Sequence, residues 1–285
     1  MTALPDLIGR ESAISFPMLG GIVFDPPSSI TLFGRTVYLY GLVIAVAFAV
    51  GMLWCARHAP KLGVESEHVY DVFLWTLPAA IIGARLYYVL FRLDWYRAHP
   101  GEILAVWEGG LAIYGGILGG ILAVWLTCRR RKVSALATLD LIAPAVLLGQ
   151  AIGRWGNFFN REAFGRETEI FCRMGLTTAT GETVYVHPTF LYESLWNTAG
   201  FVLMSTMLRK GRHRYNGQFL ALYFLWYGLG RAFIEGLRTD SLMIPGTAVR
   251  VSQVLSILLA AGGAAVLVLR RGTSSAVSDS SSPSP

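Results

Sequence analysis

Charged and amide side chains occur in a part of the sequence that is otherwise suited to the interior of a membrane. Residues 153–166 read GRWGNFFNREAFGR and directly follow the apolar run 135–152. Arg154 and Asn157 are therefore expected at the end of a membrane helix. A charged side chain costs ~2.5–3.5 kcal/mol at mid-bilayer on insertion scales, and less near the interface. An arginine at a helix end can also simply reach for lipid phosphates, so Arg154 alone does not define a site.

A second set of polar residues recurs in the apolar segment 218–237. These residues are Tyr227, Arg231, Glu235 and Arg238, at positions i, i+4, i+8 and i+11. At about 100° per residue this spacing places all four on one face of a helix. Such a stripe has to face a protein interior or a wet cavity rather than lipid. It indicates either an Arg231–Glu235 pair that only joins helices, or part of a binding site.

Two further residues extend this pattern. Arg85 lies in the apolar stretch IIGARLYYVLF, and His187 begins the stretch HPTFLYES. His187 by itself is better explained as a capping histidine than as a catalyst. Arginines that converge with a few carboxylates describe an anion site, because a guanidinium binds phosphate bidentately and stays charged when partly buried. In a membrane, the natural anion is the phosphate of a phospholipid.

The composition shows what must position these residues. Hydrophobic residues make up 54% of the 285 residues and charged residues only 15%, which is far less charge than a soluble domain carries. The chain is therefore expected to be a polytopic membrane protein. Its net charge of +6 indicates basic cytoplasmic loops and anionic lipid headgroups rather than nucleic acid. No set of Cys, His, Asp and Glu has the spacing of metal ligands, so we expect no metal.

We expect an all-α polytopic membrane protein with seven transmembrane helices and a small outward-facing head region. Each span approaches the ~20 residues that cross a bilayer core. The expected spans are 36–56, 70–91, 103–127, 135–156, 188–208, 218–237 and 249–269. Together they form one domain, 1–271, in which 158–187 is the head segment and its TTATGETVYV forms a strand pair. The Ser/Pro-rich tail 272–285 is expected to be disordered because it has little to bury.

Basic residues follow the first, third, fifth and seventh spans. By the positive-inside rule these ends are cytoplasmic. The N-terminus then lies outside and the C-terminus in the cytoplasm. In this orientation Arg154 and Arg231 lie toward the outer face of the membrane. The first residues lack a basic region followed by an apolar region, so we expect a signal anchor rather than a cleavable signal peptide.

The stretch WEGGLAIYGGILGG, residues 107–120, contains three pairs of glycines. Small residues allow membrane helices to pack closely, and this explains some of them. Paired glycines on both sides of LAIY also fit a broken or re-entrant helix, which is tolerated only beside protein or a water-filled cavity. Tyr114 would then face that cavity.

Four sequence blocks resemble the bacterial prolipoprotein diacylglyceryl transferase family. The blocks are GRWGNFFNREAFGR, GGLAIYGG, HPTFLYES and YGLGRAFIEGLR, and YLYGLVIA and GARLYYVLF match more weakly. They occur in the family's order and cover nearly all of residues 30–270.

The resemblance implies a reaction and a place. The diacylglyceryl group of phosphatidylglycerol moves to the cysteine thiol in the lipobox of a prolipoprotein, which gives a thioether and glycerol phosphate and is the first step of lipoprotein maturation. It also implies seven helices in the bacterial plasma membrane and an active site toward the outer face. The partners are phosphatidylglycerol, the lipobox peptide and the bilayer, and no cofactor is implied because the lipid is a substrate.

The resemblance also implies roles at matching positions. Arg154 and Arg231 contact the phosphate, while Asn157 and Asn160 orient the headgroup or the lipobox peptide. Three further residues position the arginines or gate the substrate: Glu162, Glu235 and Arg238. The remaining substrate contacts are assigned to Tyr40, Tyr227, Arg85 and His187.

Tyr114 departs from the family, since many members carry histidine there. Tyrosine has a pKa near ~10 and is a poor base at neutral pH. The thiol, with a pKa near ~8.5, still needs a base or a positive field to become a thiolate. Either the arginine field supplies this alone or another group such as His187 serves, and Tyr114 hydrogen-bonds the headgroup or takes part in the chemistry.

Two other classes of function compete with a transferase. A transporter of an anionic solute also uses intramembrane arginines and broken helices. It predicts an inverted repeat, which the sequence does not show, and the polar residues gather at one face. A non-catalytic scaffold would not need Arg154, Asn157 and Arg231 directed inward.

Overall fold

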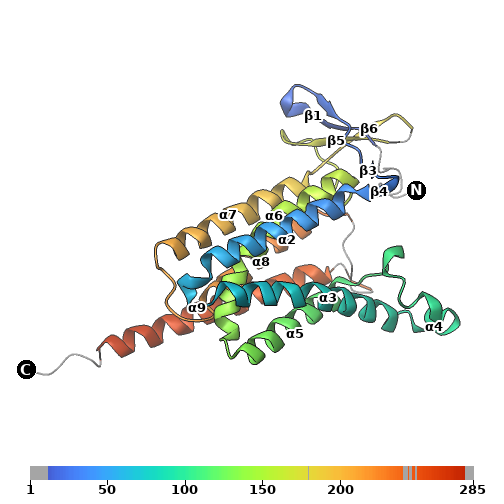
Figure 1. The fold of residues 1–285 in the computed structure, drawn as a ribbon. Helices are drawn as coiled ribbons and strands as arrows, with labels where there is room; N and C mark the ends of the chain where they lie inside the picture. The colour runs from blue at the N-terminus through green and yellow to red at the C-terminus, as the bar shows by residue number, and fades with distance from the viewer. Residues whose placement is uncertain (1–11, 179, 240–242, 244–245, 248, 280–285) are drawn as a thin grey trace, which may run out of the picture. The chain divides into compact units, whose positions relative to one another are not determined.

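The computed structural model of the protein describes residues 12–178, 180–239, 243, 246–247 and 249–279. Helices dominate this part of the chain (Figure 1). The long helices are α2 (Leu39–His58), α3 (Ser66–Leu90), α5 (Ile113–Arg131), α6 (Ala135–Asn160), α7 (Thr189–Arg209), α8 (Gln218–Glu235) and α9 (Val251–Asp279). The short helix α4 (Leu93–Ala98) follows α3 and precedes α5 along the chain.

Each expected span overlaps one of these long helices. Four described stretches are long and apolar enough to cross a membrane: Leu39–Leu62, Ser66–Leu90, Ala135–Asn160 and Val251–Arg270. The protein is therefore a mostly helical membrane protein of the polytopic kind. The other three helices, α5, α7 and α8, carry more glycine or more polar side chains.

The expected third span, 103–127, is only partly helical. Residues 103–112 form one short 3₁₀ turn, Val106–Glu108, and irregular backbone, and α5 begins at Ile113. Gly109 and Gly110 have φ of +92° and +68°, which glycine adopts without steric cost. Irregular backbone at this point agrees with the broken-helix interpretation of the first glycine pair.

The later glycines of this stretch serve close packing instead. α3 and α5 run side by side (Figure 1). A Cβ atom at Gly115 would overlap the carbonyl oxygen of Gly83, and one at Gly119 would overlap that of Ala79. Both interpretations of the glycines thus apply, each to different residues.

The expectation of an all-α fold is correct only in part: the described chain is mostly helical, but two small sheets are also present. One sheet has the antiparallel order β2-β1-β5-β6, and the other pairs β3 with β4. The strands are β1 (Ile14–Phe16), β2 (Ile22–Phe24), β3 (Ser29–Leu32), β4 (Arg35–Tyr38), β5 (Met174–Thr177) and β6 (Thr183–Val186). The head segment does contain a strand pair, β5–β6, but the stretch TTATGETVYV (177–186) covers β6 and the turn and only the last residue of β5. The first four strands are too short for alternation to reveal them.

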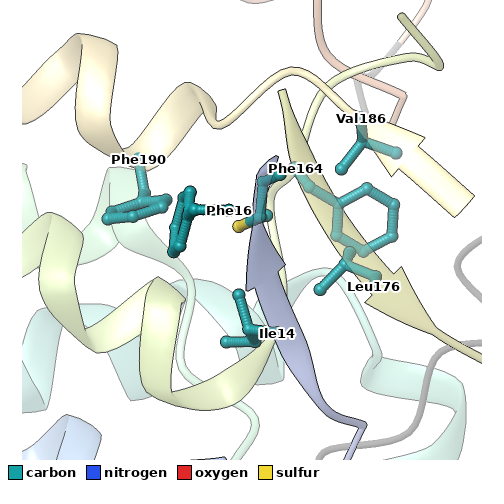
Figure 2. Close-up of a cluster of buried hydrophobic side chains, with 7 residues drawn as sticks. Ile14, Phe16, Phe164, Leu176, Val186 and Phe190 are labelled. Carbon is teal, nitrogen blue, oxygen red and sulfur yellow. The ribbon is translucent and has the colours of Figure 1, made fainter. Parts of the chain in front are cut away.

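A small hydrophobic core holds the four-stranded sheet (Figure 2). Ile14 and Phe16 of β1 both point into it, because alternate residues of a strand share a face. The other labelled members are Phe164, Leu176, Val186 and Phe190. This core joins the start of the chain to the residues between α6 and α7, so the head region includes more than 158–187.

The chain divides into two compact units, one formed by 1–51 with 143–285 and the other by 52–142. In the first unit, α8 packs along α9 and against α7, and in the second, α3 packs along α5. The expected disordered tail overlaps α9 as far as Asp279. Residues 280–285, and residues 1–11 on which the signal-anchor expectation rests, lie outside the described residues.

Candidate functional site

Three arginines and two glutamates from three helices meet in the first unit. They are Arg154 on α6, Glu193 on α7, Arg231 and Glu235 on α8, and Arg238 just beyond the end of α8. We call these five residues the arginine–glutamate cluster.

Glu193 is the centre of the cluster. Its Oε2 lies 2.7 Å from Nη2 of Arg154, and its Oε1 lies 2.8 Å from Nη1 of Arg231. Nη1 of Arg238 approaches the same Oε1 at 3.7 Å. One carboxylate therefore holds guanidinium groups from two helices, and these are charge-assisted hydrogen bonds of the strong kind.

Arg231 has a second partner on its own helix. Its Nη2 lies 2.5 Å from Oε2 of Glu235, at the i, i+4 spacing. The end of α8 is fixed in turn by Arg250, whose Nη1 donates to the Glu235 carbonyl oxygen at 2.7 Å. The expected ion pair is present, and it is part of a larger group rather than a simple link between two helices.

The charge and burial of the cluster suit an anion. Counted over these five side chains, three guanidinium groups and two carboxylates give a formal charge of +1. The carboxylate side chains are 5% and 2% exposed, for Glu193 and Glu235, while the arginine side chains are 12–22% exposed. An incoming anion therefore meets the guanidinium groups rather than the carboxylates.

An amide network extends from Arg154 along the last turn of α6. Nη1 of Arg154 donates to Oδ1 of Asn157 at 3.3 Å. The amides of Asn157 and Asn160 both donate to Oε1 of Glu162, at 2.9 and 3.4 Å. The structure thus brings together these four residues of the motif GRWGNFFNREAFGR.

Two tyrosines lie beside this group. The ring of Tyr40 covers Gly156, where a Cβ atom would lie 2.5 Å from a ring carbon. Tyr227 stacks on Tyr223 with ring centroids 5.6 Å apart. The hydroxyl of Tyr227 interacts electrostatically with the guanidinium of Arg231. Both tyrosines therefore flank residues of the expected site.

His187 belongs to a different set of contacts. Its Nδ1 lies 3.4 Å from the hydroxyl of Tyr192, which lies 3.4 Å from the thiol of Cys172. Burial and the nearby charge of Arg166 lower the pKa of His187, which keeps the imidazole neutral at physiological pH. The described contacts do not join His187 to the arginine–glutamate cluster.

Arg85 and Tyr114 belong to the second unit. The guanidinium of Arg85 donates to four backbone carbonyl oxygens at 2.6–3.1 Å; these are of Glu102, Ile103, Gly109 and Gly110. It fixes the irregular segment that precedes α5, and its role in substrate binding stays a prediction. Tyr114 is the second residue of α5, with its ring 6.4 Å from that of Tyr87.

Glu193 is the residue that our sequence-based choice of site residues omitted. It occurs in HPTFLYES, and a carboxylate within an apolar helix is itself a sign of function. Its partners lie on other helices, so no spacing along the sequence reveals them. Among the described residues, no three His, Cys, Asp or Glu side chains gather where they could hold a metal ion.

The fold and the cluster define a class: a helical membrane protein with a partly buried, net positive arginine site suited to a phosphate. Comparison with known proteins narrows this class. The sequence profile described as prolipoprotein diacylglyceryl transferase matches residues 27–269. The chain belongs to this family.

Several curated relatives are similar over most of their length, and each is named phosphatidylglycerol–prolipoprotein diacylglyceryl transferase. The protein from Pediococcus pentosaceus is 41% identical over 252 residues, which cover 86% of this chain and 90% of the relative. The protein from Lactiplantibacillus plantarum is 42% identical over 253 residues, covering 86% and 89%. That from Streptococcus uberis is 40% identical over 248 residues, covering 86% and 95%.

Proposed function

We propose that this protein is a phosphatidylglycerol–prolipoprotein diacylglyceryl transferase whose arginine–glutamate cluster binds the lipid phosphate. It catalyses the first step of lipoprotein maturation. The observation that carries the placement of the site is the Glu193 carboxylate, which holds Arg154 and Arg231 side by side. Family membership supports the reaction, and the cluster supports where in the chain the reaction takes place.

The charge of the cluster fits the substrate. The phosphodiester of phosphatidylglycerol is a monoanion, and the cluster carries one positive charge in excess. A guanidinium has five N–H donors in a planar fork, so Arg154 and Arg231 can bind a phosphate in addition to their carboxylate partner. Asn157 and Asn160 then orient the headgroup or the peptide. Tyr40 and Tyr227 line the same phosphate-binding site.

The chemical step increases the negative charge on the phosphate. The cysteine thiolate attacks the diacylglyceryl carbon that carries the phosphate, a C–S bond forms, and the C–O bond breaks. The phosphodiester monoanion thereby becomes the dianion of glycerol phosphate. Arginines that are already oriented stabilise this developing charge without reorganisation. Three further residues hold Arg154 and Arg231 in position for this step: Glu162, Glu235 and Arg238.

The thiol has to lose a proton before or during the attack. The positive field of the cluster favours the thiolate, and this needs no dedicated base. His187 is tied to Tyr192 and Cys172, which argues against it as the base. Tyr114 takes part as a hydrogen-bond donor to the headgroup in this proposal, and Arg85 as a residue that positions the segment before α5.

The membrane arrangement is part of the proposal. All seven long helices span the bacterial plasma membrane, with the N-terminus outside, the C-terminus in the cytoplasm and the active site toward the outer face. The positive-inside pattern of the loops supports this orientation. Residues 1–271 form the catalytic domain with the head segment 158–187, and 272–285 form a cytoplasmic tail.

The test uses the purified full chain in detergent with phosphatidylglycerol and a lipobox peptide that contains one cysteine. Glycerol phosphate release and the mass of the peptide are followed together. We expect release coupled to a diacylglyceryl mass gain, lost in Arg154→Gln and kept in Arg166→Gln, an exposed arginine of the same motif. A peptide with serine in place of cysteine should gain no mass.

Two outcomes would separate the parts of this proposal. Folded wild-type protein that releases no glycerol phosphate would contradict the transferase activity and favour transport of an anionic solute. Full activity in Arg154→Gln and Arg231→Gln, with active wild type, would contradict only the placement of the site. An active Tyr114→Phe would exclude a phenolic base, whereas an inactive one would make Tyr114 part of the chemistry or of headgroup binding.

A further inference from the structure

The tip of the β3–β4 hairpin exposes a large apolar side chain that nothing in the described protein covers. Phe33 is 101% exposed, and its neighbour Leu32 is 45% exposed. Phe33 and Gly34 form the turn, with φ of +50° and +74°. The left-handed region is unfavourable for a bulky residue such as phenylalanine. The hairpin therefore presents Phe33 outward despite costs in both hydration and backbone conformation.

The position of the hairpin limits what can cover this tip. β4 ends at Tyr38 and α2 begins at Leu39, without a linker (Figure 1). The N–H of Leu39 donates to the carbonyl oxygen of Ser28 at 3.0 Å, which ties the base of the hairpin to the first turn of α2. The hairpin is thus attached directly to a helix that is long and apolar enough to span a membrane.

A simple length estimate places the tip near the lipid headgroups. Four residues of strand extend at most about 13 Å, at ~3.3 Å per residue. The headgroup layer on each side of the ~30 Å hydrocarbon core is about 5–7 Å thick. An upright hairpin would carry the tip about 6–8 Å past this layer, whereas a hairpin tilted toward the membrane plane keeps the tip within it. This holds whichever side of the membrane the N-terminus faces.

The side chains near the tip have the chemistry of a membrane interface. Arg35 follows the turn and is exposed, and Tyr38 at the end of β4 is 53% exposed. Aromatic residues favour the headgroup level, and a basic residue there is attracted to anionic lipids. The middle of the hairpin carries the exposed polar pair Thr31 and Thr36.

We propose that the β3–β4 hairpin is a membrane-interface anchor. Leu32 and Phe33 enter the boundary between headgroups and acyl chains, and Arg35 pairs with a lipid phosphate. The partner is the surface of the bilayer, and this inference does not depend on the transferase activity. Its consequence is that the start of α2, and with it Tyr40 beside Gly156, is held at a fixed depth.

The test measures the depth of the tip with a fluorophore. Phe33→Cys and Glu182→Cys are labelled with an environment-sensitive dye in a Cys172→Ser background, since Cys55 and Cys128 are buried. Glu182 lies in the exposed β5–β6 turn and serves as the control. The labelled full chain is placed in nanodiscs that hold one copy each, made of phosphatidylglycerol and phosphatidylcholine with or without shallow spin-labelled lipid.

We expect the dye at position 33 to be quenched by the spin-labelled lipid and to be at least ~5-fold less accessible to aqueous iodide than the dye at 182, as for apolar side chains that enter the acyl boundary. Arg35→Glu should reduce the lipid quenching at 33 without lowering the melting temperature in detergent. Equal iodide access at 33 and 182 with no lipid quenching would overturn the proposal. Protection of 33 that occurs only with two copies per disc would overturn it too, in favour of a second copy as the partner.

Discussion

Two arginine environments in the described part of the protein differ in the kind of acceptor they use. In the second unit, Arg85 donates to the carbonyl oxygens of an irregular backbone segment. In the first unit, Arg154 and Arg231 share the carboxylate of Glu193. Carbonyl oxygens are part of the main chain and cannot leave without unfolding the segment, whereas side-chain carboxylates can exchange partners.

From this difference we predict that Arg85 serves the fold and that the cluster arginines serve the reaction. Arg85 has its N–H groups engaged by fixed dipoles, so an anion would have to compete with the fold itself. The arginine–glutamate cluster keeps an excess positive charge and exposes its guanidinium side chains more than its carboxylates.

The largest effect is expected from removal of a cluster arginine. Arg154→Gln should lower the transfer rate by about 10²–10³-fold, the loss typical of one preorganised donor to a developing oxyanion. Arg154→Lys keeps the charge but not the planar fork, so its loss should be smaller. The initial rate per folded molecule is the measurement, and an Arg154→Gln rate within a few-fold of wild type would contradict a role for Arg154 in the reaction.

Glu193→Gln should lower the rate by about 10–100-fold, or ~1.4–2.7 kcal/mol in the barrier, because Arg154 and Arg231 lose the carboxylate that orients them. The amide keeps one acceptor, but its NH₂ group then faces a guanidinium donor. Glu182→Gln, on an exposed turn, is the matched control. A double-mutant cycle with Arg154→Lys should show strong non-additivity, and additive losses would mean that Glu193 does not act through Arg154.

Arg85→Gln should lower stability rather than activity. Backbone carbonyls that lose their donors cost about 1–3 kcal/mol for each one that stays buried, so the melting temperature in detergent should fall. The activity per folded molecule should not change. If Arg85→Gln instead raises the KM for phosphatidylglycerol at unchanged melting temperature, Arg85 binds substrate and the distinction fails.

Gly110→Ala tests the same segment without changing a charge. A Cβ atom at Gly110 would lie 2.5 Å from Nη1 of Arg85, at a φ of +68°. Overpacking of this kind costs about 1–3 kcal/mol, and the melting temperature should fall accordingly. Gly101→Ala is the control, since nothing lies within 4 Å of its Cβ position. Equal melting temperatures for both variants would show that Arg85 is not held as tightly as the structure indicates.

The smallest effect is expected at His187. Its pKa in the folded protein is lowered by burial and by Arg166, so the unfolded chain binds more protons below pH ~6.5. Its contribution to stability is present above that pH and is lost as the pH falls through the folded pKa. His187→Asn should therefore reduce the drop in melting temperature between pH 7.5 and 5.5. Loss of all activity in His187→Asn would instead identify it as the base.

The sequence predicts the helices of this protein well, because a membrane span needs a long apolar run. It predicts the α6 and α8 portions of the site because polar residues in such runs are rare. The strands β1–β4 were not predicted, since three or four residues cannot show a period, and pairing partners such as Ile14 and Leu176 are far apart along the chain.

The two arginine environments were also not distinguished from sequence. Arg85 and Arg154 both appear as arginines in apolar runs. Backbone carbonyl acceptors have no signature in the sequence, so the sequence gives the same expectation of substrate binding for Arg85 and Arg154. Glu193 was omitted for the related reason that its contacts join three helices and follow no spacing.

The length of α6 has a consequence for where the lipid reacts. A helix from Ala135 to Asn160 is about 39 Å long at ~1.5 Å per residue, against a hydrocarbon core of ~30 Å. Measured from Ala135 at one boundary of the core, Arg154 lies about 29 Å along the helix, at the opposite boundary. The surplus length carries Asn157 and Asn160 into the polar layer. If the arginines bind the phosphate as proposed, a phospholipid can reach them while its acyl chains stay immersed, and the height of the site in the membrane then selects for a lipid.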